Sequence, residues 1–234
     1  MVKASLRLRL DWQELDKGIR MNLKKIITTL LIILGCWGSV WIGKNLLPKY
    51  LPAKVEAKYH ARAKGNPKAP LWIIEYLDFQ CASCRESMKF LEEYLVAHPR
   101  EIYLQVRYYP LIHNHRYALK SAIYADCAAK QGKFWEFSES LFKNQVQWAV
   151  SPEPDVFFEQ TAAKLKLDVA ALKACVTDTS VKDAVLAEKA EGKSLGITMT
   201  PTSFVNGKKI IGLSAIKAEL EQYFKEKKSD ALPK

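Results

Sequence analysis

The sequence predicts an α/β domain preceded by one membrane-spanning helix at the N-terminus. Short β-prone runs near both ends of residues 65–234, with amphipathic helices between them, predict the domain. An uninterrupted apolar run at residues 26–43 predicts the span. The chain has 234 residues, of which 49% are hydrophobic, so it is large and apolar enough to bury a sizeable core.

The formal net charge of +11 is concentrated near the N-terminus. Residues 1–64 hold 13 Lys and Arg against 4 Asp and Glu, whereas residues 65–234 hold 23 against 21. The domain therefore lacks the excess of basic residues typical of nucleic-acid-binding proteins, and no nucleic-acid partner is expected. Basic residues beside an apolar run are instead typical of an anchor in a lipid bilayer.

Residues 26–43 contain no charged side chain, and as a helix they would extend about 27 Å, close to the hydrocarbon thickness of a bilayer. Trp37 and Trp41 suit a membrane interface near the far end of the run. A buried core helix fits less well, because the run is apolar on all faces and lies at the edge of the chain. We therefore expect an uncleaved signal anchor.

The Lys24-Lys25 pair before the run favours a cytoplasmic tail at residues 1–25 and a domain on the extracytoplasmic side. Residues 44–64, rich in Pro, Lys and Ala, predict a linker. Cleavage as a secretory signal and lipidation at Cys36 stay open. A start at Met21 also stays open, which would leave the first 20 residues untranslated.

The domain begins with a predicted βαβ unit. The apolar run at residues 71–77 predicts a buried strand, residues 83–97 show the spacing of an amphipathic helix, and residues 101–109 alternate as a second strand. Cys81 and Cys84 lie at the first strand-to-helix junction.

A helical block follows at about residues 113–195. Its predicted helices are residues 115–129, 134–142, 154–165, 168–176 and 180–195. Asp168 is a candidate N-cap, and Ser180-x-x-Asp183 resembles a capping box. His113 and His115, at the start of the block, are expected to be exposed loop residues.

The last part of the chain predicts a hairpin and a helix. The runs at residues 202–205 and 208–211 flank Asn206-Gly207, a strong hairpin signal, and an amphipathic helix begins after Ser214. The order is then βαβ, a helical block, and ββα. This is the arrangement of the thioredoxin fold with a helical insertion between its halves.

The pair Cys81-Ala-Ser-Cys84 has the spacing needed for disulfide exchange. Cys81 precedes the first turn of a helix, where unpaired N–H groups and the helix dipole stabilise a thiolate, and Cys84 can then release a mixed disulfide. A zinc site would need further ligands, and the sequence has no second C-x-x-C. The motif alone leaves a purely structural disulfide open.

Thr200-Pro201 precedes the hairpin. A Pro that opens a strand in this way can be cis, and in a thioredoxin-like fold this loop faces the C-x-x-C. An ordinary trans Pro at the start of a strand is the alternative. The spacing alone does not decide between them.

Three stretches resemble the DsbA-like branch of the thioredoxin superfamily, and together they cover about residues 65–225: GNPKAPLWIIEYLDFQCASC, ADCAAKQGKFWEFSESLF and TPTSFVNGKKIIG. The resemblance implies that Cys81 is the nucleophile, that Cys84 is the resolving thiol, and that Pro201 is cis with Thr200 before it. Glu75 matches a buried acid that handles protons near the thiols; the alternative is a strand residue facing solvent.

One feature departs from the family's strong oxidants, which tend to carry Pro-His or Pro-Tyr between the cysteines. Ala82-Ser83 offers no aromatic or imidazole group to stabilise the thiolate. This implies a moderate reduction potential, which reductases and isomerases share.

Cys127 and Cys175 both lie in the helical block, and helical phase directs both inward. Two buried free cysteines are one interpretation. A structural disulfide is the other; some relatives carry a comparable pair, and an oxidising compartment favours it.

The resemblance implies a protein thiol–disulfide oxidoreductase, most simply an oxidase, in the inner (cytoplasmic) membrane with its domain on the periplasmic side. The expected partners are substrate proteins with thiols or disulfides, a membrane redox partner that resets the site, and the lipid bilayer; no cofactor or metal is expected. The alternatives are a reductase or isomerase of the same fold, and a non-enzymatic module that binds copper or a partner protein.

Overall fold

The computed structural model describes Thr29, Leu31 and residues 57–230. The predicted tail and membrane span, apart from those two residues, and the linker up to residue 56 lie outside the described residues. Within the described part of the chain, no helix is both long and apolar enough to cross a bilayer. The N-terminal anchor therefore stays a prediction.

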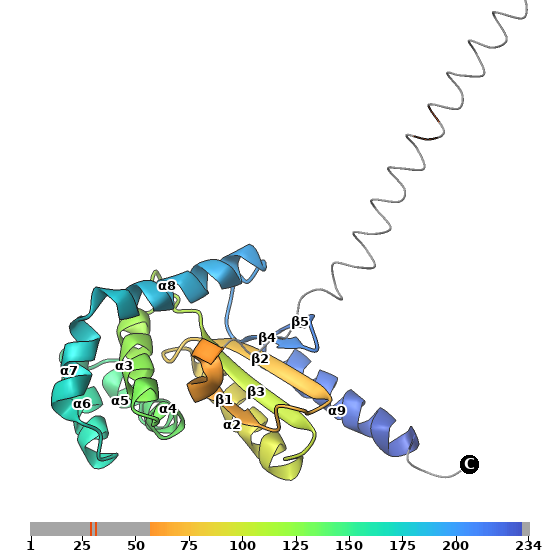
Figure 1. Ribbon diagram of the computed structural model, residues 1–234, viewed down its shortest axis with the longest axis horizontal. Helices are drawn as coiled ribbons and strands as arrows, with labels where there is room; N and C mark the ends of the chain where they lie inside the picture. Colours follow the sequence, from red (N-terminus) through yellow and green to blue (C-terminus); the bar gives the residue numbers. More distant parts are fainter. Residues whose placement is uncertain (1–28, 30, 32–56, 231–234) are drawn as a thin grey trace, which may run out of the picture. The chain divides into compact units, whose positions relative to one another are not determined.

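The described strands form one mixed sheet in the order β1-β3-β2-β4-β5 (Figure 1). The central strands β2 and β3 are parallel, and the other neighbours pair antiparallel. Every residue of β3 is buried, as expected for an apolar strand covered on both faces. The strands are β1 (Ala63–Gly65), β2 (Leu71–Leu77), β3 (Ile102–Tyr108), β4 (Thr202–Val205) and β5 (Lys208–Ile211).

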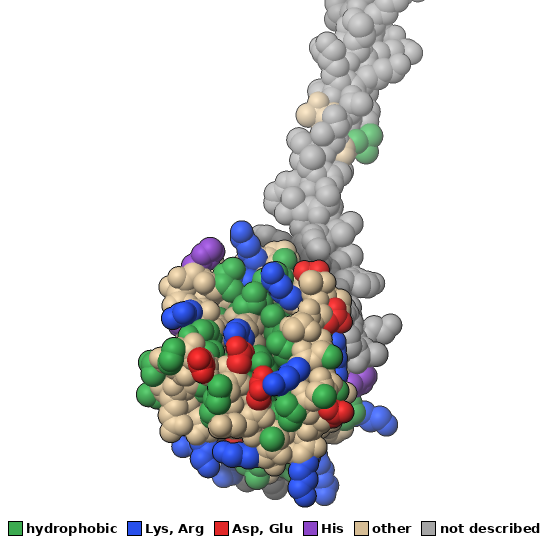
Figure 2. Space-filling model, turned by 90° about the vertical axis from the view of Figure 1, so that its left-hand side faces the viewer, with side chains coloured by type: hydrophobic (Ala, Val, Ile, Leu, Met, Phe, Trp, Pro, Cys, Tyr) green, Lys and Arg blue, Asp and Glu red, His purple; other side chains and the backbone are tan. Residues whose placement is uncertain are grey.

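Helices α3 to α8 gather at one end of the sheet, on the left in Figure 1, whereas α2 and α9 contact each other beside it. On the face in Figure 2, acidic and basic side chains are interspersed with hydrophobic ones. The helices are η1 (Ala57–Arg62, a 3₁₀ helix), α2 (Ala82–Ala97), α3 (Ala118–Lys130), α4 (Phe134–Lys143), α5 (Gln145–Trp148), α6 (Pro154–Lys164), α7 (Val169–Thr177), α8 (Thr179–Ser194) and α9 (Leu213–Asp230).

The strands and helices predicted from the sequence are present, with ends that agree within a few residues. Three short elements were not predicted: η1, β1 and α5. Each has fewer than seven residues, too few to show a period in the sequence.

The linker predicted for residues 44–64 extends too far, because η1 and β1 pack on the domain. Tyr59 is fully buried, Arg62 pairs with Glu188 of α8, and β1 pairs with β3. The partners of this segment lie far along the chain. Its Lys- and Ala-rich composition therefore gave no sign that it packs on the domain.

Helix α8 is attached to η1 and to β3 by one ion pair each. Arg62 Nη1 lies 2.9 Å from Glu188 Oε2, and the Tyr108 backbone N–H donates to the same oxygen at 2.9 Å. Arg107 Nη1 lies 2.8 Å from Glu191 Oε2. Because Arg62 and Glu188 are both buried, removing Arg62 would leave the Glu188 carboxylate inside the protein without its cationic partner.

The helix caps agree with the sequence at one position and differ at another. Asp168 caps α7 by accepting the Ala171 N–H at 2.9 Å, so that prediction is confirmed. The capping box predicted at Ser180 is wrong, because α8 begins at Thr179 with Asp178 as its N-cap. Asp is as good a cap as Ser, and it comes two residues earlier.

Candidate active site

The active-site turn joins the end of β2 to the start of α2. Cys81 is the N-cap residue of α2, with an extended backbone, and its carbonyl accepts the Cys84 N–H at 3.1 Å in the first helical turn. Asp78 shapes the turn: its side chain accepts the Gln80 N–H at 2.7 Å, and its carbonyl accepts the Cys81 N–H at 3.1 Å. The nucleophile expected from the sequence therefore sits at a helix N-terminus.

Cys81 is half-buried, and its thiol is acidic. The pKa of Cys81 is lowered to about 6, chiefly by a hydrogen bond from the Cys84 side chain, with further contributions from Thr200 and the Cys84 backbone. Burial and the Asp78 charge act in the opposite direction. At neutral pH, Cys81 is therefore mostly thiolate, the form that attacks disulfides.

Cys84 differs sharply from Cys81, although it lies one helical turn away. It is fully buried, and burial together with the neighbouring Cys81 raises its pKa well above that of an ordinary thiol. The two sulfurs are not bonded to each other in this structure. One thiol of the pair is thus half-buried and mostly ionised, and the other is buried and protonated.

The Thr200–Pro201 peptide bond is cis, and this loop lies against the nucleophile. Cys81 Sγ is 3.5 Å from the Thr200 carbonyl oxygen. The Thr200 hydroxyl is buried without a hydrogen-bond partner of ordinary geometry among the described residues, yet it lowers the pKa of both thiols. Residues 119 positions apart in the sequence therefore meet at one site.

Glu75 is fully buried on β2, so the solvent-facing alternative is wrong. One carboxylate oxygen accepts the Ser87 hydroxyl at 2.7 Å, and the other accepts the Ser203 hydroxyl. Burial raises the pKa of Glu75 to about 7; the Cys81 charge also raises it, while the two hydroxyls lower it. A carboxyl group with this pKa can both give and take a proton near neutral pH.

Gln145 holds the active-site turn from the helical insertion, and sequence reasoning missed it. Its buried side-chain amide donates to the Phe79 carbonyl at 2.7 Å and to the Cys81 carbonyl at 3.1 Å. Gln80 makes a similar link in the other direction, by accepting the Tyr117 N–H. No signal in the sequence marks Gln145, because its partners lie more than 60 residues away.

The prediction that both histidines are exposed loop residues holds for His113 and is wrong for His115. His115 is partly buried, and its Nδ1 lies 2.7 Å from Asp78 Oδ2. Asp78 lies three residues before Cys81. Its contact with His115 depends on the fold, so the sequence did not indicate it.

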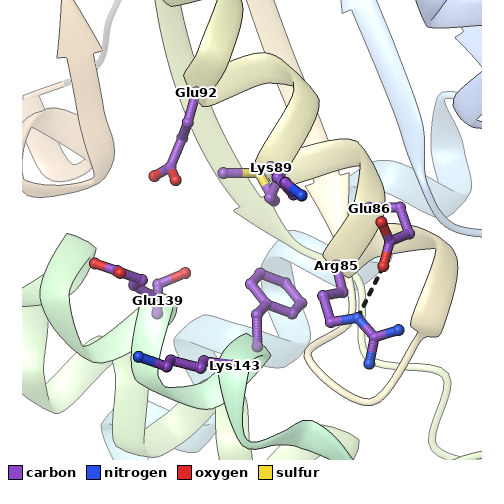
Figure 3. Close-up of a pocket in the computed structure, with 9 residues that line it drawn as sticks. Arg85, Glu86, Lys89, Glu92, Glu139 and Lys143 are labelled. Atoms are coloured by element: carbon purple, nitrogen blue, oxygen red, sulfur yellow. Dashed lines mark hydrogen bonds and ion pairs between the residues drawn. The ribbon is translucent and has the colours of Figure 1, made fainter. Parts of the chain in front are cut away.

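A cavity of about 540 Å³ lies between α4 and α2, the helix that begins at the active-site turn (Figure 3). Charged side chains of both signs line it, among them Arg85 and Glu92 from α2 and Lys143 from α4. Within the described residues, no group of three or more His, Cys, Asp or Glu is arranged to hold a metal ion.

The Thioredoxin_4 family model, described as Thioredoxin, matches residues 58–225, which include all of the site described above. The chain belongs to this thioredoxin family. The match begins within η1, in agreement with the packing of that segment on the domain.

Curated relatives match over a similar length of the chain. The Na(+)/H(+) antiporter NhaA 1 of Mycolicibacterium gilvum is 29% identical over 148 residues, 62% of this chain and 23% of that protein. The protein of the same name from Salinispora arenicola is 32% identical over 157 residues, 66% and 23% respectively. The chain thus spans about a quarter of the length of these relatives.

Solved structures show the same fold. Wolbachia pipientis alpha-DsbA1 is similar with a TM-score of 0.60 and 24% identity, over 70% of this chain and 89% of that chain. BdbD from Bacillus subtilis has a TM-score of 0.60 and 20% identity, over 70% and 92%. A thioredoxin-like oxidoreductase from Silicibacter pomeroyi is similar with a TM-score of 0.59 and 21% identity, over 73% of this chain and 94% of that chain. The fold is therefore that of DsbA-type thiol–disulfide oxidoreductases, a thioredoxin fold with a helical insertion.

Proposed function

We propose that this protein exchanges disulfides with substrate proteins through Cys81 and Cys84, and that it works as an oxidase. The observation that carries the proposal is the contrast between the two thiols. Cys81 is half-exposed at a helix N-terminus with a pKa of about 6, whereas Cys84 is buried with a raised pKa. Such a pair has one sulfur for the substrate and one that stays inside.

The reaction takes two exchange steps. A substrate thiolate attacks the Cys81 sulfur of the Cys81–Cys84 disulfide; that bond breaks, a mixed disulfide forms, and Cys84 leaves as a thiolate that takes up a proton. A second substrate thiolate then attacks the substrate sulfur of the mixed disulfide, and Cys81 leaves. The substrate dithiol loses two electrons, which remain on the two active-site sulfurs.

The surrounding residues support both steps. The low pKa of Cys81 makes it a good leaving group in the second step. Glu75, with a pKa of about 7, is suited to carry a proton at the buried thiol. Thr200 and Pro201 lie against Cys81, in the place where a substrate chain would pair.

Three exposed apolar side chains adjoin the residues that contact the active-site turn. Met199 precedes Thr200, Val146 follows Gln145, and Val150 follows Ala149, whose carbonyl lies 3.5 Å from the Gln80 amide. Exposed apolar groups next to the residues that contact the active-site turn suit unfolded protein segments as substrates.

We place the domain on the extracytoplasmic side of the inner membrane, tethered by the predicted span at residues 26–43. The Cys127–Cys175 disulfide supports an oxidising compartment, since such bonds are rare in the cytosol. The likeness to proteins named as antiporters supports a membrane setting. A membrane redox partner would return the two thiols to the disulfide.

The second candidate is a reductase or isomerase that uses the same residues. It is favoured by Ala82-Ser83, which offers no imidazole or aromatic ring to the Cys81 thiolate. The direction of electron flow depends on the reduction potential, which a glutathione equilibrium measures.

The test is to equilibrate the full chain in glutathione buffers and to follow oxidation of a dithiol peptide. If the protein is an oxidase, the reduction potential of its Cys81–Cys84 pair is clearly above that of thioredoxin, which is about −270 mV. The Cys81→Ser variant then no longer oxidises the peptide. A potential close to thioredoxin's would overturn the oxidase and support the reductase. An inactive wild type that binds Cu(I) stoichiometrically would overturn exchange in favour of a metal-binding module.

A further inference from the structure

The Asp78 carboxylate is a buried charge that the proposed reaction does not use. Its side chain is fully shielded from solvent, three residues before the nucleophile. Oδ1 accepts the Gln80 N–H at 2.7 Å; Oδ2 accepts the Leu111 N–H at 2.8 Å and lies 2.7 Å from His115 Nδ1. Asp78 therefore ties the active-site turn to the loop that follows β3.

This carboxylate works against the chemistry of the site. A thiolate forms less readily near a negative charge, and the Asp78 charge raises the pKa of Cys81 while Cys84 and Thr200 lower it. A neutral amide at this position would have one acceptor oxygen instead of two, so in this geometry it would accept the Gln80 N–H or the Leu111 N–H, not both. A cation that offsets the Asp78 charge would therefore favour the Cys81 thiolate.

His115 is the ionisable side chain in direct contact with Asp78. Its imidazole remains 26% exposed and reaches solvent, whereas the Asp78 side chain does not. A protonated imidazole that donates to a buried carboxylate forms a charge-assisted hydrogen bond and cancels most of the negative charge.

We propose that His115 is a positioning residue for the nucleophile: it holds the Asp78 carboxylate and compensates its charge near the Cys81 thiolate. The role rests on the proposed function, because it concerns the reactivity of the same thiol. Within the part of the chain that the structure describes, His115 makes no hydrogen bond or ion pair with either sulfur, so it acts through Asp78.

Other charged groups face the same region and must be separated from His115. Lys189 of α8 interacts with the Asp78 charge, Glu75 of β2 interacts with Cys81, and Cys84 contacts Cys81 directly. Arg116 adjoins His115 in sequence and lies over the Tyr117 ring. Among the described residues, His115 is the one of these groups hydrogen-bonded to Asp78.

His113 provides a matched control. It lies two residues before His115 on the same loop and is exposed. The variants His113→Gln and His115→Gln therefore each remove one imidazole from the same loop. Only His115→Gln also removes a contact with Asp78.

The experiment is a pH titration of the thiolate absorbance at 240 nm in the reduced full chain. His115→Gln raises the Cys81 midpoint by about half to one pH unit, and Asp78→Asn lowers it by a similar amount. His115→Gln has little further effect when added to Asp78→Asn, and His113→Gln leaves the midpoint unchanged.

A His115→Gln midpoint equal to that of His113→Gln would overturn the role of His115, as would an undiminished effect in the Asp78→Asn background. If the variants do not fold, the wild type decides: at one pH, the His115 ring resonances must have different chemical shifts in reduced and oxidised protein, and identical shifts overturn the role. Disulfide exchange by the wild type is measured separately, so failure of the proposed function is distinguishable.

Discussion

The two cysteine pairs of the domain differ in almost every physical respect. Cys81 and Cys84 are three residues apart and are separate thiols, whereas Cys127 and Cys175 are 48 residues apart and form a disulfide between α3 and α7. Cys81 begins a helix and is half-exposed, while Cys127 lies inside α3 and is buried. The comparison shows that position in the fold, rather than spacing along the chain, separates a reactive pair from a structural one.

The largest expected effect is on activity, at the first pair. Cys81→Ser abolishes dithiol oxidation, because no other exposed thiolate is available at the active-site turn, and thermal unfolding changes little. Peptide oxidation and circular dichroism measure the two properties. Cys84→Ser is the matched control, incubated with a disulfide-containing peptide. Its Cys81 thiolate attacks the peptide disulfide and releases one peptide thiolate, and the mixed disulfide persists because the resolving thiol is missing; mass spectrometry detects it.

Replacing Cys127 and Cys175 together by Ala tests the second pair. The free energy of unfolding falls by about 2–4 kcal/mol, because a cross-link that closes a loop of this length is lost from the unfolded state. Urea unfolding measures the change. The midpoint of the Cys81 thiolate titration is unchanged in this variant. A shift of the midpoint would show that the two cysteine pairs are coupled.

Glu75→Gln tests the buried acid beside the reactive pair. The pKa of Glu75 is raised from 4.5 to about 7, so the folded protein binds this proton more tightly than the unfolded chain, and the wild type loses stability as pH rises through that range. The variant lacks this loss.

In the Cys81→Ser background, the stability gained by Glu75→Gln is then about 2 kcal/mol larger at pH 8 than at pH 5. Urea unfolding at the two pH values measures it. A gain independent of pH would show that Glu75 keeps an ordinary pKa.

Asp168→Ala gives the smallest expected effect. It removes the cap of α7, the helix that carries Cys175, and costs about 1 kcal/mol. Comparing this cost with and without the Cys127–Cys175 bond shows whether the disulfide or the cap holds the helix. Asp168→Asn preserves the cap and serves as the control.

Much of the site was predictable because its key parts are local. A strand, two cysteines three residues apart and a helix follow one another directly, and periodicity alone places Cys81 at the junction. Burial of Glu75 was anticipated by its apolar neighbours. Gln145 and His115 were not predictable, because each acts on residues at least 37 positions away and has no pattern of its own.

The sequence by itself determined the order of strands and helices, the two candidate cysteine pairs and the apolar run at residues 26–43, since these depend on spacing and composition. Only the tertiary structure decided that Thr200 meets Cys81, that Cys127 pairs with Cys175, and that Arg62 belongs to the domain through Glu188. The physical reason is that pKa, burial and ion pairing depend on distances in space, which the packing of remote segments sets.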